Sequence, residues 1–277
     1  MSARSRQRRS PPAARPTEPT GLVAGALLDI DGVLHVGMRP VPGAADALRA
    51  LSARGIAYRF LTNSTTASRV TLGASLREIG LPVRDEELVT APVATADYIR
   101  HRWPGARCYL IAKGDVDRDF AEAGLTVLPD DATEADVVVI GGAEERLTYE
   151  RMNRAYRLLV AGARLVAMHR NPAWRTADGM QLDSGPYVIA LEAAAGVRAI
   201  TVGKPALTFF REALRLLGVP PRRVVMVGDD ARNDLLPARR LGLRTVLVRT
   251  GKPVADGDTE HADFVLDSIA DLPEALT

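Results

Sequence analysis

The sequence predicts an α/β protein that has a doubly wound parallel-sheet core and an inserted α/β domain. Short apolar segments alternate with segments of helical periodicity along the chain, as in proteins built from strand–helix–strand units. Strand segments such as ALLD (26–29) and ADVVVIGG (135–142) are largely apolar, which indicates parallel sheets covered on both faces. These strands outnumber what one modest sheet needs, so we expect two domains.

Three strands that end in polar side chains locate the insertion. They lie far apart in the sequence, at 26–31, 57–63 and 223–230. If they share one sheet, the residues between the second and the third form a separate domain. We therefore assign the insertion to 91–198, and the core to 21–90 and 199–277.

Each of the first two strands precedes a helix. The strand at 26–29 runs into acids and Gly32. Apolar residues at helical spacing, closed by a glycine, predict the next helix: Ala44, Ala47, Leu48, Leu51 and Gly55. AYRFLT (57–62) is the second strand, and the hydroxyls of 64–66 offer caps for a helix over 67–79.

The middle of the chain repeats this alternation. The expected elements are helices at 91–103, 115–122, 148–161 and 185–195, and strands at 107–112, 135–142 and 164–168. Gly141-Gly142 follows an apolar strand, but GGAEERLT lacks the GxGxxG spacing of a dinucleotide-binding loop. We interpret it as a plain turn.

The last part of the chain completes the core. Phe210, Ala213, Leu214 and Leu217 mark a helix that ends at Gly218. The remaining elements are a strand at 223–230, a helix at 231–241 and strands at 244–249 and 263–266.

Polar residues at the strand ends predict the functional site, because ligands bind outside the carboxyl ends of open parallel sheets. The groups concerned are Asp29-x-Asp31-Gly32, Thr62-Asn63 and Gly228-Asp229-Asp230, with Gly203-Lys204-Pro205 before a helix. Clustered carboxylates need a cation, and oxygen ligands select a hard ion such as Mg²⁺. A metal beside an ammonium, a hydroxyl and backbone N–H groups suits a phosphoryl group.

Lysine usage also singles out one of these groups. Only three of the 36 basic residues are lysines: Lys113, Lys204 and Lys252. Arginine and lysine are not interchangeable at a site that needs a compact charge, so the lysine at 204 favours a functional role there.

Four motifs resemble those of the haloacid dehalogenase (HAD) superfamily of phosphatases: DIDGV (29–33), FLTN (60–63), VGKP (202–205) and GDDARND (228–234). Their order and separation also match, and the resemblance covers residues 24–275. It implies a Rossmann-like core. The long stretch between the second and third motifs resembles the α/β cap of the NagD-like, class IIA branch.

The resemblance implies a role for each motif residue. Asp29 is the expected nucleophile, and Asp31 the acid and base that serves the leaving group and then water. Mg²⁺ is expected on Asp29, Asp229 and the backbone carbonyl of Asp31. Thr62, the amide of Asn63 and Lys204 are expected to bind the phosphoryl group. Asp234 would orient metal-bound waters or the lysine. Asp230 is interpreted as solvated, with a contact to the site as the alternative.

The resemblance assigns no role to the cap residues. His169, Asn171 and Arg175 are candidate substrate contacts, and a surface loop is the alternative. His35 follows the first motif and lies either on a flap over the site or in the packed interior.

The expected function is a Mg²⁺-dependent phosphatase that hydrolyses a small phosphorylated metabolite through an aspartyl-phosphate. N-phosphorylated side chains and pyrophosphate also stay open as substrates. A phospho-acceptor signalling module is the alternative from another class, since receiver domains place acids, a threonine and a lysine around Mg²⁺. Asp31 argues against it, because it offers an acid/base that would discharge the intermediate. A binding platform with vestigial activity is a third alternative.

Composition and charge limit the other classes. Hydrophobic residues make up 47% and charged residues 25%, as in globular proteins. The single cysteine, Cys108, excludes an intramolecular disulfide. No apolar run is long enough to span a membrane. We expect a cytoplasmic enzyme without nucleic-acid or membrane partners; a homodimer stays open.

The net charge of +2 conceals two different parts. Residues 1–20 contain five arginines and one glutamate, a net +4, so the rest of the chain carries +2 minus +4, or −2. The first 20 residues are rich in proline and poor in large apolar groups, which predicts a disordered basic tail. Targeting or nucleic-acid tethering is the alternative for this segment.

Overall fold

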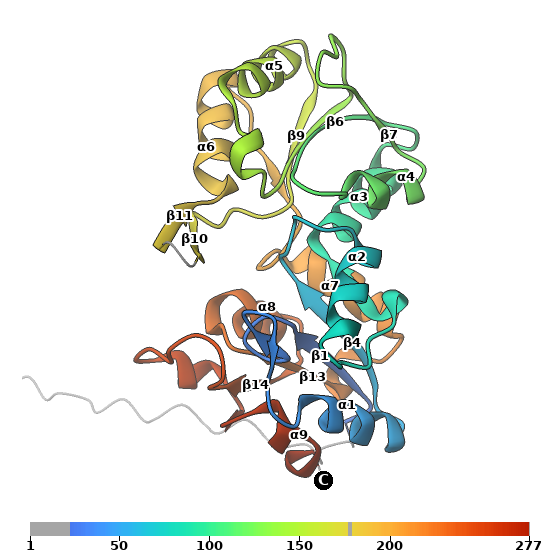
Figure 1. Ribbon diagram of the computed structural model, residues 1–277, viewed down its shortest axis with the longest axis vertical. Helices are drawn as coiled ribbons and strands as arrows, with labels where there is room; N and C mark the ends of the chain where they lie inside the picture. The colour runs from blue at the N-terminus through green and yellow to red at the C-terminus, as the bar shows by residue number, and fades with distance from the viewer. Residues whose placement is uncertain (1–22, 177–178, 277) are drawn as a thin grey trace, which may run out of the picture.

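The computed structural model describes residues 23–176 and 179–276. The tail at 1–20 lies outside the described residues. The described chain forms two α/β units that lie one above the other in Figure 1, and the last described residues, 272–276, belong to the lower unit. No helix among the described residues is long and apolar enough to cross a membrane.

The lower unit is built on one six-stranded parallel sheet, in the order β15-β14-β13-β1-β4-β5. Its strands are β1 Gly25–Asp29, β4 Ala57–Thr62, β5 Leu88–Thr90, β13 Val224–Gly228, β14 Arg244–Val248 and β15 Phe264–Leu266. The three strands that end in polar residues, β1, β4 and β13, are neighbours, with β1 in the middle. The prediction that they share one sheet is confirmed.

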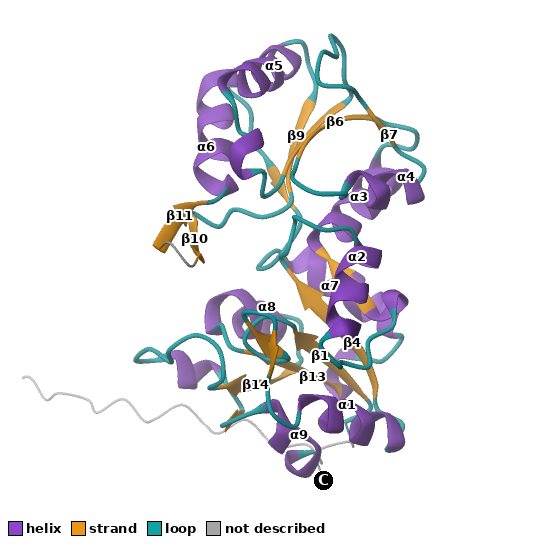
Figure 2. Ribbon diagram, in the orientation of Figure 1, coloured by secondary structure: helices purple, strands orange, loops and turns teal. Residues whose placement is uncertain are grey.

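Helices cover both faces of this sheet, as the colouring by secondary structure shows (Figure 2). They are α1 Ala44–Ala53, α2 Arg69–Glu78, α7 Leu207–Leu217, α8 Leu236–Arg240 and α9 Leu272–Ala275, with a π-helical turn at Ala231–Leu235. Successive residues of β1 point to opposite faces. Leu27 packs in the cluster of α7, whereas Leu28 packs in the cluster of α1. The fully apolar strands are therefore explained by burial on both sides.

The upper unit contains a five-stranded parallel sheet in the order β12-β9-β8-β6-β7. Its strands are β6 Arg107–Ile111, β7 Thr126–Val127, β8 Val137–Ile140, β9 Arg164–Ala167 and β12 Ile200–Thr201. Its helices are α3 Ala91–Arg102, α4 Asp117–Glu122, α5 Tyr149–Val160 and α6 Ser184–Ala195. We call this unit the cap and the lower one the core. The domain bounds stay a prediction, and β12 returns the chain to the core through residues 202–206.

Two antiparallel hairpins were not predicted. One follows β1 and pairs β2 His35–Val36 with β3 Arg39–Pro40. The other pairs β10 Ala173–Thr176 with β11 Gly179–Leu182, and it projects from the cap in Figure 1. Both are too short to show a clear alternation in the sequence, because their strands have at most four residues.

Candidate active site

A cavity of about 820 Å³ lies between the core and the cap. Its floor comes from the ends of core strands and the loops after them, including Asp29, Asp31, Thr62, Asn63, Lys204, Asp229 and Asp234. Its roof comes from cap loops and the β10–β11 hairpin, including Gly142, Glu144, His169, Asn171, Trp174, Met180, Leu182 and Asp183. The polar groups predicted from the four motifs therefore line one cavity.

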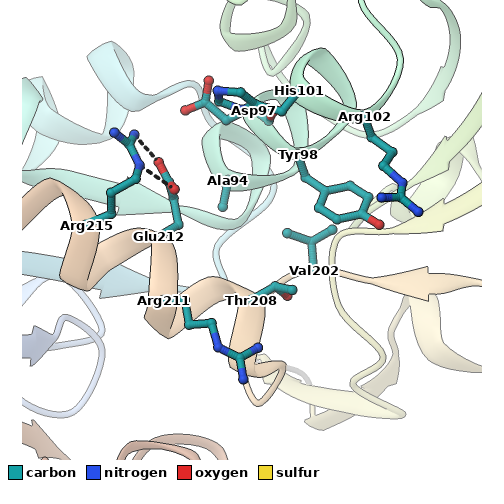
Figure 3. A pocket seen from close by; sticks show the side chains of 10 residues that line it. All are labelled: Ala94, Asp97, Tyr98, His101, Arg102, Val202, Thr208, Arg211, Glu212 and Arg215. Atoms are coloured by element: carbon teal, nitrogen blue, oxygen red, sulfur yellow. Dashed lines mark hydrogen bonds and ion pairs between the residues drawn. The ribbon is translucent and has the colours of Figure 1, made fainter. Parts of the chain in front are cut away.

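A second cavity of about 430 Å³ lies between α3 and α7 (Figure 3). Glu212 and Arg215 on its wall bond to each other at 2.5 and 2.9 Å. None of the carboxylates at the strand ends reaches this cavity. The chemistry predicted from the sequence therefore belongs to the larger cavity.

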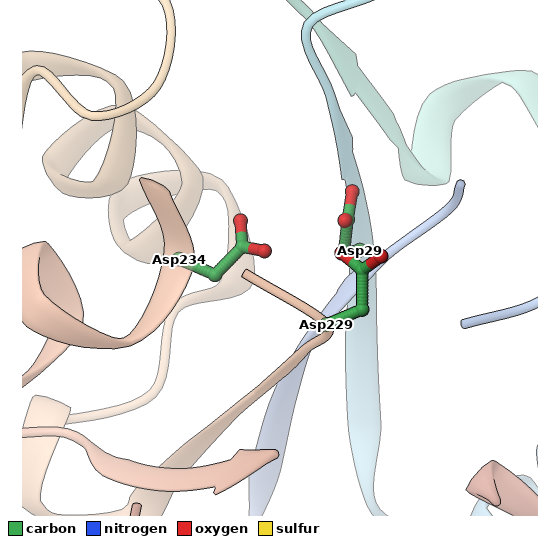
Figure 4. Close-up of side chains that lie close together, drawn as sticks. All are labelled: Asp29, Asp229 and Asp234. Atoms are coloured by element: carbon green, nitrogen blue, oxygen red, sulfur yellow. The ribbon is translucent and has the colours of Figure 1, made fainter. Parts of the chain in front are cut away.

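Three buried carboxylates meet on the floor of the larger cavity (Figure 4). Asp29 ends β1, Asp229 follows β13, and Asp234 lies on the π-helical turn. Each offers one oxygen within 4.8 Å of the other two. We call Asp29, Asp229 and Asp234 the acidic cluster. It forms because β1 and β13 are adjacent parallel strands whose carboxyl ends share one edge of the sheet.

Lys204 joins two members of this cluster. Its Nζ lies 2.7 Å from Asp29 Oδ1 and 2.8 Å from Asp234 Oδ1. Its side chain is only 6% exposed. Three carboxylates against one ammonium would leave two negative charges in a buried place if all were ionised.

The pKa values reflect this excess of negative charge. Burial raises the pKa of Asp29 to about 6, and Lys204 opposes the shift. Burial, with the charge of Asp29, raises the pKa of Asp234 to about 7. Burial alone would lower the pKa of Lys204, but Asp234 and Asp29 outweigh it and hold that pKa above its usual value.

The acidic cluster fits a divalent metal ion. It offers oxygen ligands only, which Mg²⁺ prefers, and an excess negative charge that a dication would balance. Asp234 Oδ2 is buried and has no hydrogen-bond partner among the described residues. Asp234 is thus able to accept a metal ion or a metal-bound water on this oxygen without losing another bond.

Glycines keep the backbone close to Asp229. A Cβ on Gly32 would lie 2.3 Å from Asp229 Oδ2, and a Cβ on Gly251 would lie 2.0 Å from the same atom. Gly32 also has a φ of +84°, which favours glycine. The sequence predicts a turn after Asp31 from Gly32. Glycine is favoured at this position by the lack of space for a Cβ as well as by the backbone conformation.

Asp31 faces the cavity, unlike the buried Asp29. Its side chain is 69% exposed, and its Oδ1 lies 3.7 Å from Nε2 of His35. Thr62 Oγ1 lies 3.4 Å from Asp31 Oδ2 and accepts a hydrogen bond from the Ser64 N–H at 2.9 Å. His35 is buried and lies in the β2 strand beside the cavity.

The side chain of Asn63 has a role that the sequence did not reveal. Its Nδ2 donates to the Lys204 carbonyl at 2.9 Å, and its Oδ1 accepts from the Lys204 N–H at 2.8 Å. This pair of bonds fixes the loop that carries Lys204 to the end of β4. The bonds use the side-chain amide, whereas the sequence predicts that the backbone amide binds phosphate.

The loop after β14 was also missed. The Lys252 N–H donates to Asp229 Oδ2 at 2.8 Å, and Lys252 Nζ lies 2.5 Å from Asp230 Oδ2. Asp230 accepts from the N–H groups of Arg232 and Asn233. It therefore caps the π-helical turn, and the interpretation of Asp230 as merely solvated is wrong. The scarcity of lysine was a usable signal, since Lys252 lines the cavity as Lys204 does.

His169 is buried at the roof and is not a surface residue. Its Nδ1 accepts from the Asn171 N–H at 3.3 Å, which places its proton on Nε2, 3.3 Å from Thr65 Oγ1. Burial lowers its pKa, although Asp183 opposes the shift. His169 is therefore a neutral structural link between cap and core that also lines the cavity.

The other two candidate substrate contacts in the cap are Asn171 and Arg175. Asn171 lines the cavity, and its backbone bonds to His169 and Gly185. Arg175 lies on β10, but its side chain is outside the described part of the chain. A contact of either residue with substrate stays a prediction.

Comparison with known proteins agrees with this geometry. The haloacid dehalogenase-like hydrolase model matches residues 26–126, and the HAD-hydrolase-like model matches residues 201–272. Haloacid dehalogenase-like hydrolase domain-containing protein 2 of Rattus norvegicus is 37% identical over 231 residues, covering 83% of this chain and 86% of its own.

Two further proteins are similar over a longer stretch. Phospholysine phosphohistidine inorganic pyrophosphate phosphatase of Homo sapiens is 35% identical over 92% of this chain and 93% of its own. The solved structure of a p-nitrophenyl phosphatase from Archaeoglobus fulgidus has a TM-score of 0.85 and 30% identity, over 92% of this chain and all of that one. The chain therefore belongs to the HAD hydrolase superfamily, in its NagD-like class IIA branch, and is a phosphatase.

Proposed function

We propose that the protein is a Mg²⁺-dependent phosphatase that hydrolyses a small phosphate ester through an aspartyl-phosphate on Asp29. One observation carries this proposal. A buried carboxylate at the end of the central strand is bonded to a buried lysine and belongs to a cluster that fits a dication. An ammonium and a metal beside one carboxylate favour attack on a phosphoryl group, because they neutralise charge on both partners.

Asp29, Asp229 and the backbone carbonyl of Asp31 would hold the Mg²⁺ ion. When bound, the ion supplies charge neutralisation for the phosphoryl oxygens. Lys204 stabilises the ionised form of Asp29, whose Oδ1 it contacts at 2.7 Å. Asp29 attacks phosphorus, its oxygen forms the new P–O bond, and the bond to the leaving oxygen breaks.

Asp31 is suited to move the protons. Its exposed carboxyl group faces the cavity, whereas Asp29 is buried. As a general acid it gives its proton to the leaving oxygen. The carboxylate that results then takes a proton from the water that attacks the aspartyl-phosphate, which releases phosphate and restores both residues.

The cap limits the substrate to a small molecule or an exposed phosphorylated side chain. The cavity has a volume of about 820 Å³ and is lined on one side by cap loops. Trp174, Met180 and Leu182 line this roof and are partly exposed, so they offer apolar contacts to a leaving group.

Hydrolysis of an aryl phosphate tests the proposal. We expect turnover with Mg²⁺, little without it, and a loss of at least about 1,000-fold in kcat for Asp29→Asn. Asp31→Asn should slow the second step, so that the phosphorylated protein accumulates and is seen by mass spectrometry as one added phosphoryl group. Undiminished turnover by Asp29→Asn would rule out the proposed nucleophile.

N-phosphorylated side chains and pyrophosphate are a second substrate class. The 35% identical human relative whose name includes phospholysine, phosphohistidine and pyrophosphate favours testing them. A panel of phosphorylated metabolites, phosphoramidates and pyrophosphate, compared by kcat/KM, distinguishes this class from phosphate esters. A dominant P–N or pyrophosphate substrate would favour this class over phosphate esters.

A further inference from the structure

The cap contacts the core at the loop that joins β4 to α2. Three cap loops, which follow β6, β8 and β9, reach this one segment. Gly142 donates its N–H to Thr65 Oγ1 at 2.8 Å, and His169 Nε2 lies 3.3 Å from the same oxygen. The third contact is made by carboxylates of the cap and is the most extensive.

Asp115 of the cap bonds to the first turn of core helix α2. Its Oδ1 accepts the Ser68 N–H at 2.8 Å. Its Oδ2 accepts the hydroxyls of Ser68 and Thr71, both at 2.7 Å. Asp119 extends this contact, since its two oxygens lie 3.1 and 3.2 Å from the Arg69 nitrogen.

These bonds satisfy groups that a helix leaves open. The first N–H groups of a helix have no partner inside it, and negative charge is favourable beside them. The acceptors for Ser68 and Arg69 come from the cap, more than 45 residues away in the sequence. The N–H groups of Ser68 and Arg69 therefore keep these acceptors only while the cap stays in this position.

Two glycines allow the same close approach. A Cβ on Gly114 would lie 1.9 Å from the Thr66 carbonyl oxygen, and a Cβ on Gly142 would lie 2.7 Å from Thr65 Oγ1. A bulkier residue at either place would push the cap away from the loop. The absence of side chains at these two glycines and the bonds of the carboxylates thus support the same arrangement of cap and core.

We propose that Asp115 and Asp119 are positioning residues that hold the cap over the acidic cluster by capping helix α2. This rests on the proposed function, since the position of the cap matters if the leaving group binds beneath it. The core supplies the contacts to the phosphoryl group, and the cap supplies Trp174, Met180 and Leu182. Loosening the cap should therefore weaken binding of the leaving group more than binding of phosphate.

Asp115→Ala tests this, with Asp117→Ala as the matched control. Asp117 is exposed, begins α4, and its side chain has no hydrogen bond or ion pair within residues 23–176 and 179–276. With the Mg²⁺-loaded enzyme, we expect Asp115→Ala to raise KM for an aryl phosphate about tenfold. The inhibition constant of inorganic phosphate should change less than about twofold, because phosphate needs core contacts only. Asp117→Ala should match the wild type.

Substrate size gives a readout that simple destabilisation would not produce. The ratio of kcat/KM for phosphotyrosine in a peptide to that for free phosphotyrosine should rise at least about threefold in Asp115→Ala, because a loosened cap admits a larger substrate. Asp115→Asn keeps one acceptor oxygen, so its ratio should fall between those of the wild type and of Asp115→Ala. If Asp115→Ala does not fold, Gly114→Ala pushes the loop of Asp115 away from Thr66 without removing a charge, and Gly114 does not line the cavity.

Two results would overturn the proposal. One is an equal rise of KM and of the phosphate inhibition constant, which would mean that the carboxylates only order the phosphate loop. The other is an unchanged size ratio in Asp115→Ala and Gly114→Ala. Failure of the proposed function can be distinguished from these results, because the wild-type enzyme itself would then not hydrolyse the aryl phosphate.

Discussion

At the scale of single residues, Lys204 is held between two carboxylates with almost no access to solvent. A buried charge is tolerated when it is paired and hydrogen-bonded, and removing one partner leaves the others uncompensated. The same ammonium bonds to the proposed nucleophile. Its loss should therefore affect both the charge of Asp29 and the binding of the phosphoryl group.

We expect Lys204→Met to lower kcat about 100- to 1,000-fold, as the loss of one charge-stabilising donor does in other enzymes. Lys204→Arg should also fail to restore activity, because the planar guanidinium does not fit a place shaped for a compact ammonium. Steady-state kinetics with an aryl phosphate measure the effect, and circular dichroism controls for folding. Activity near the wild type in Lys204→Arg would contradict this account.

At the scale of elements, the loop after β14 brings backbone against the acidic cluster. The Lys252 N–H donates to Asp229 Oδ2, and Gly251 leaves no room for a Cβ beside that oxygen. The loop therefore orients a proposed metal ligand. Such supporting groups affect metal affinity strongly.

Gly251→Ala should lower the affinity for Mg²⁺ by about 10- to 100-fold, because its Cβ would displace Asp229. Gly257→Ala is the matched control from the same loop region. Gly257 has a φ of +87°, and a Cβ on it would meet no atom within 4 Å, so its replacement should cost about 1 kcal/mol of stability and leave Mg²⁺ affinity unchanged. Titration calorimetry with Mg²⁺ compares the two, and equal affinities would contradict the prediction.

At the scale of the whole molecule, folding forces three carboxylates into one buried place. The pKa of Asp29 rises to about 6 and that of Asp234 to about 7, from 3.8 for an unperturbed carboxyl group. A carboxyl group whose pKa rises on folding binds more protons in the folded state. These two groups therefore remove stability from the metal-free protein as pH rises from about 4 through about 7.

Mg²⁺ should reverse this loss, because it binds the deprotonated cluster of the folded protein. We expect millimolar Mg²⁺ to raise the melting temperature clearly at about pH 8 and hardly at about pH 5, with the change centred near pH 6 to 7. Removing the metal with a chelator should return the melting temperature to its metal-free value. A shift of the same size at both pH values would argue against these carboxylates as the metal site.

The sequence by itself determined the doubly wound core and the residues at its strand ends. Buried parallel strands are apolar along their length, and their polar ends meet at one edge, so Asp29, Thr62 and Asp229 could be placed together from local pattern alone. Motif resemblance added the family.

Only the tertiary structure decided how the cap meets the core and which side chains support the site. The bonds of Asp115 to Ser68, of Asn63 to Lys204 and of Lys252 to Asp229 join residues far apart in the chain. The β10–β11 hairpin likewise depends on pairing between short strands. Such contacts leave no periodic pattern in the sequence, because they depend on which segments the fold brings together.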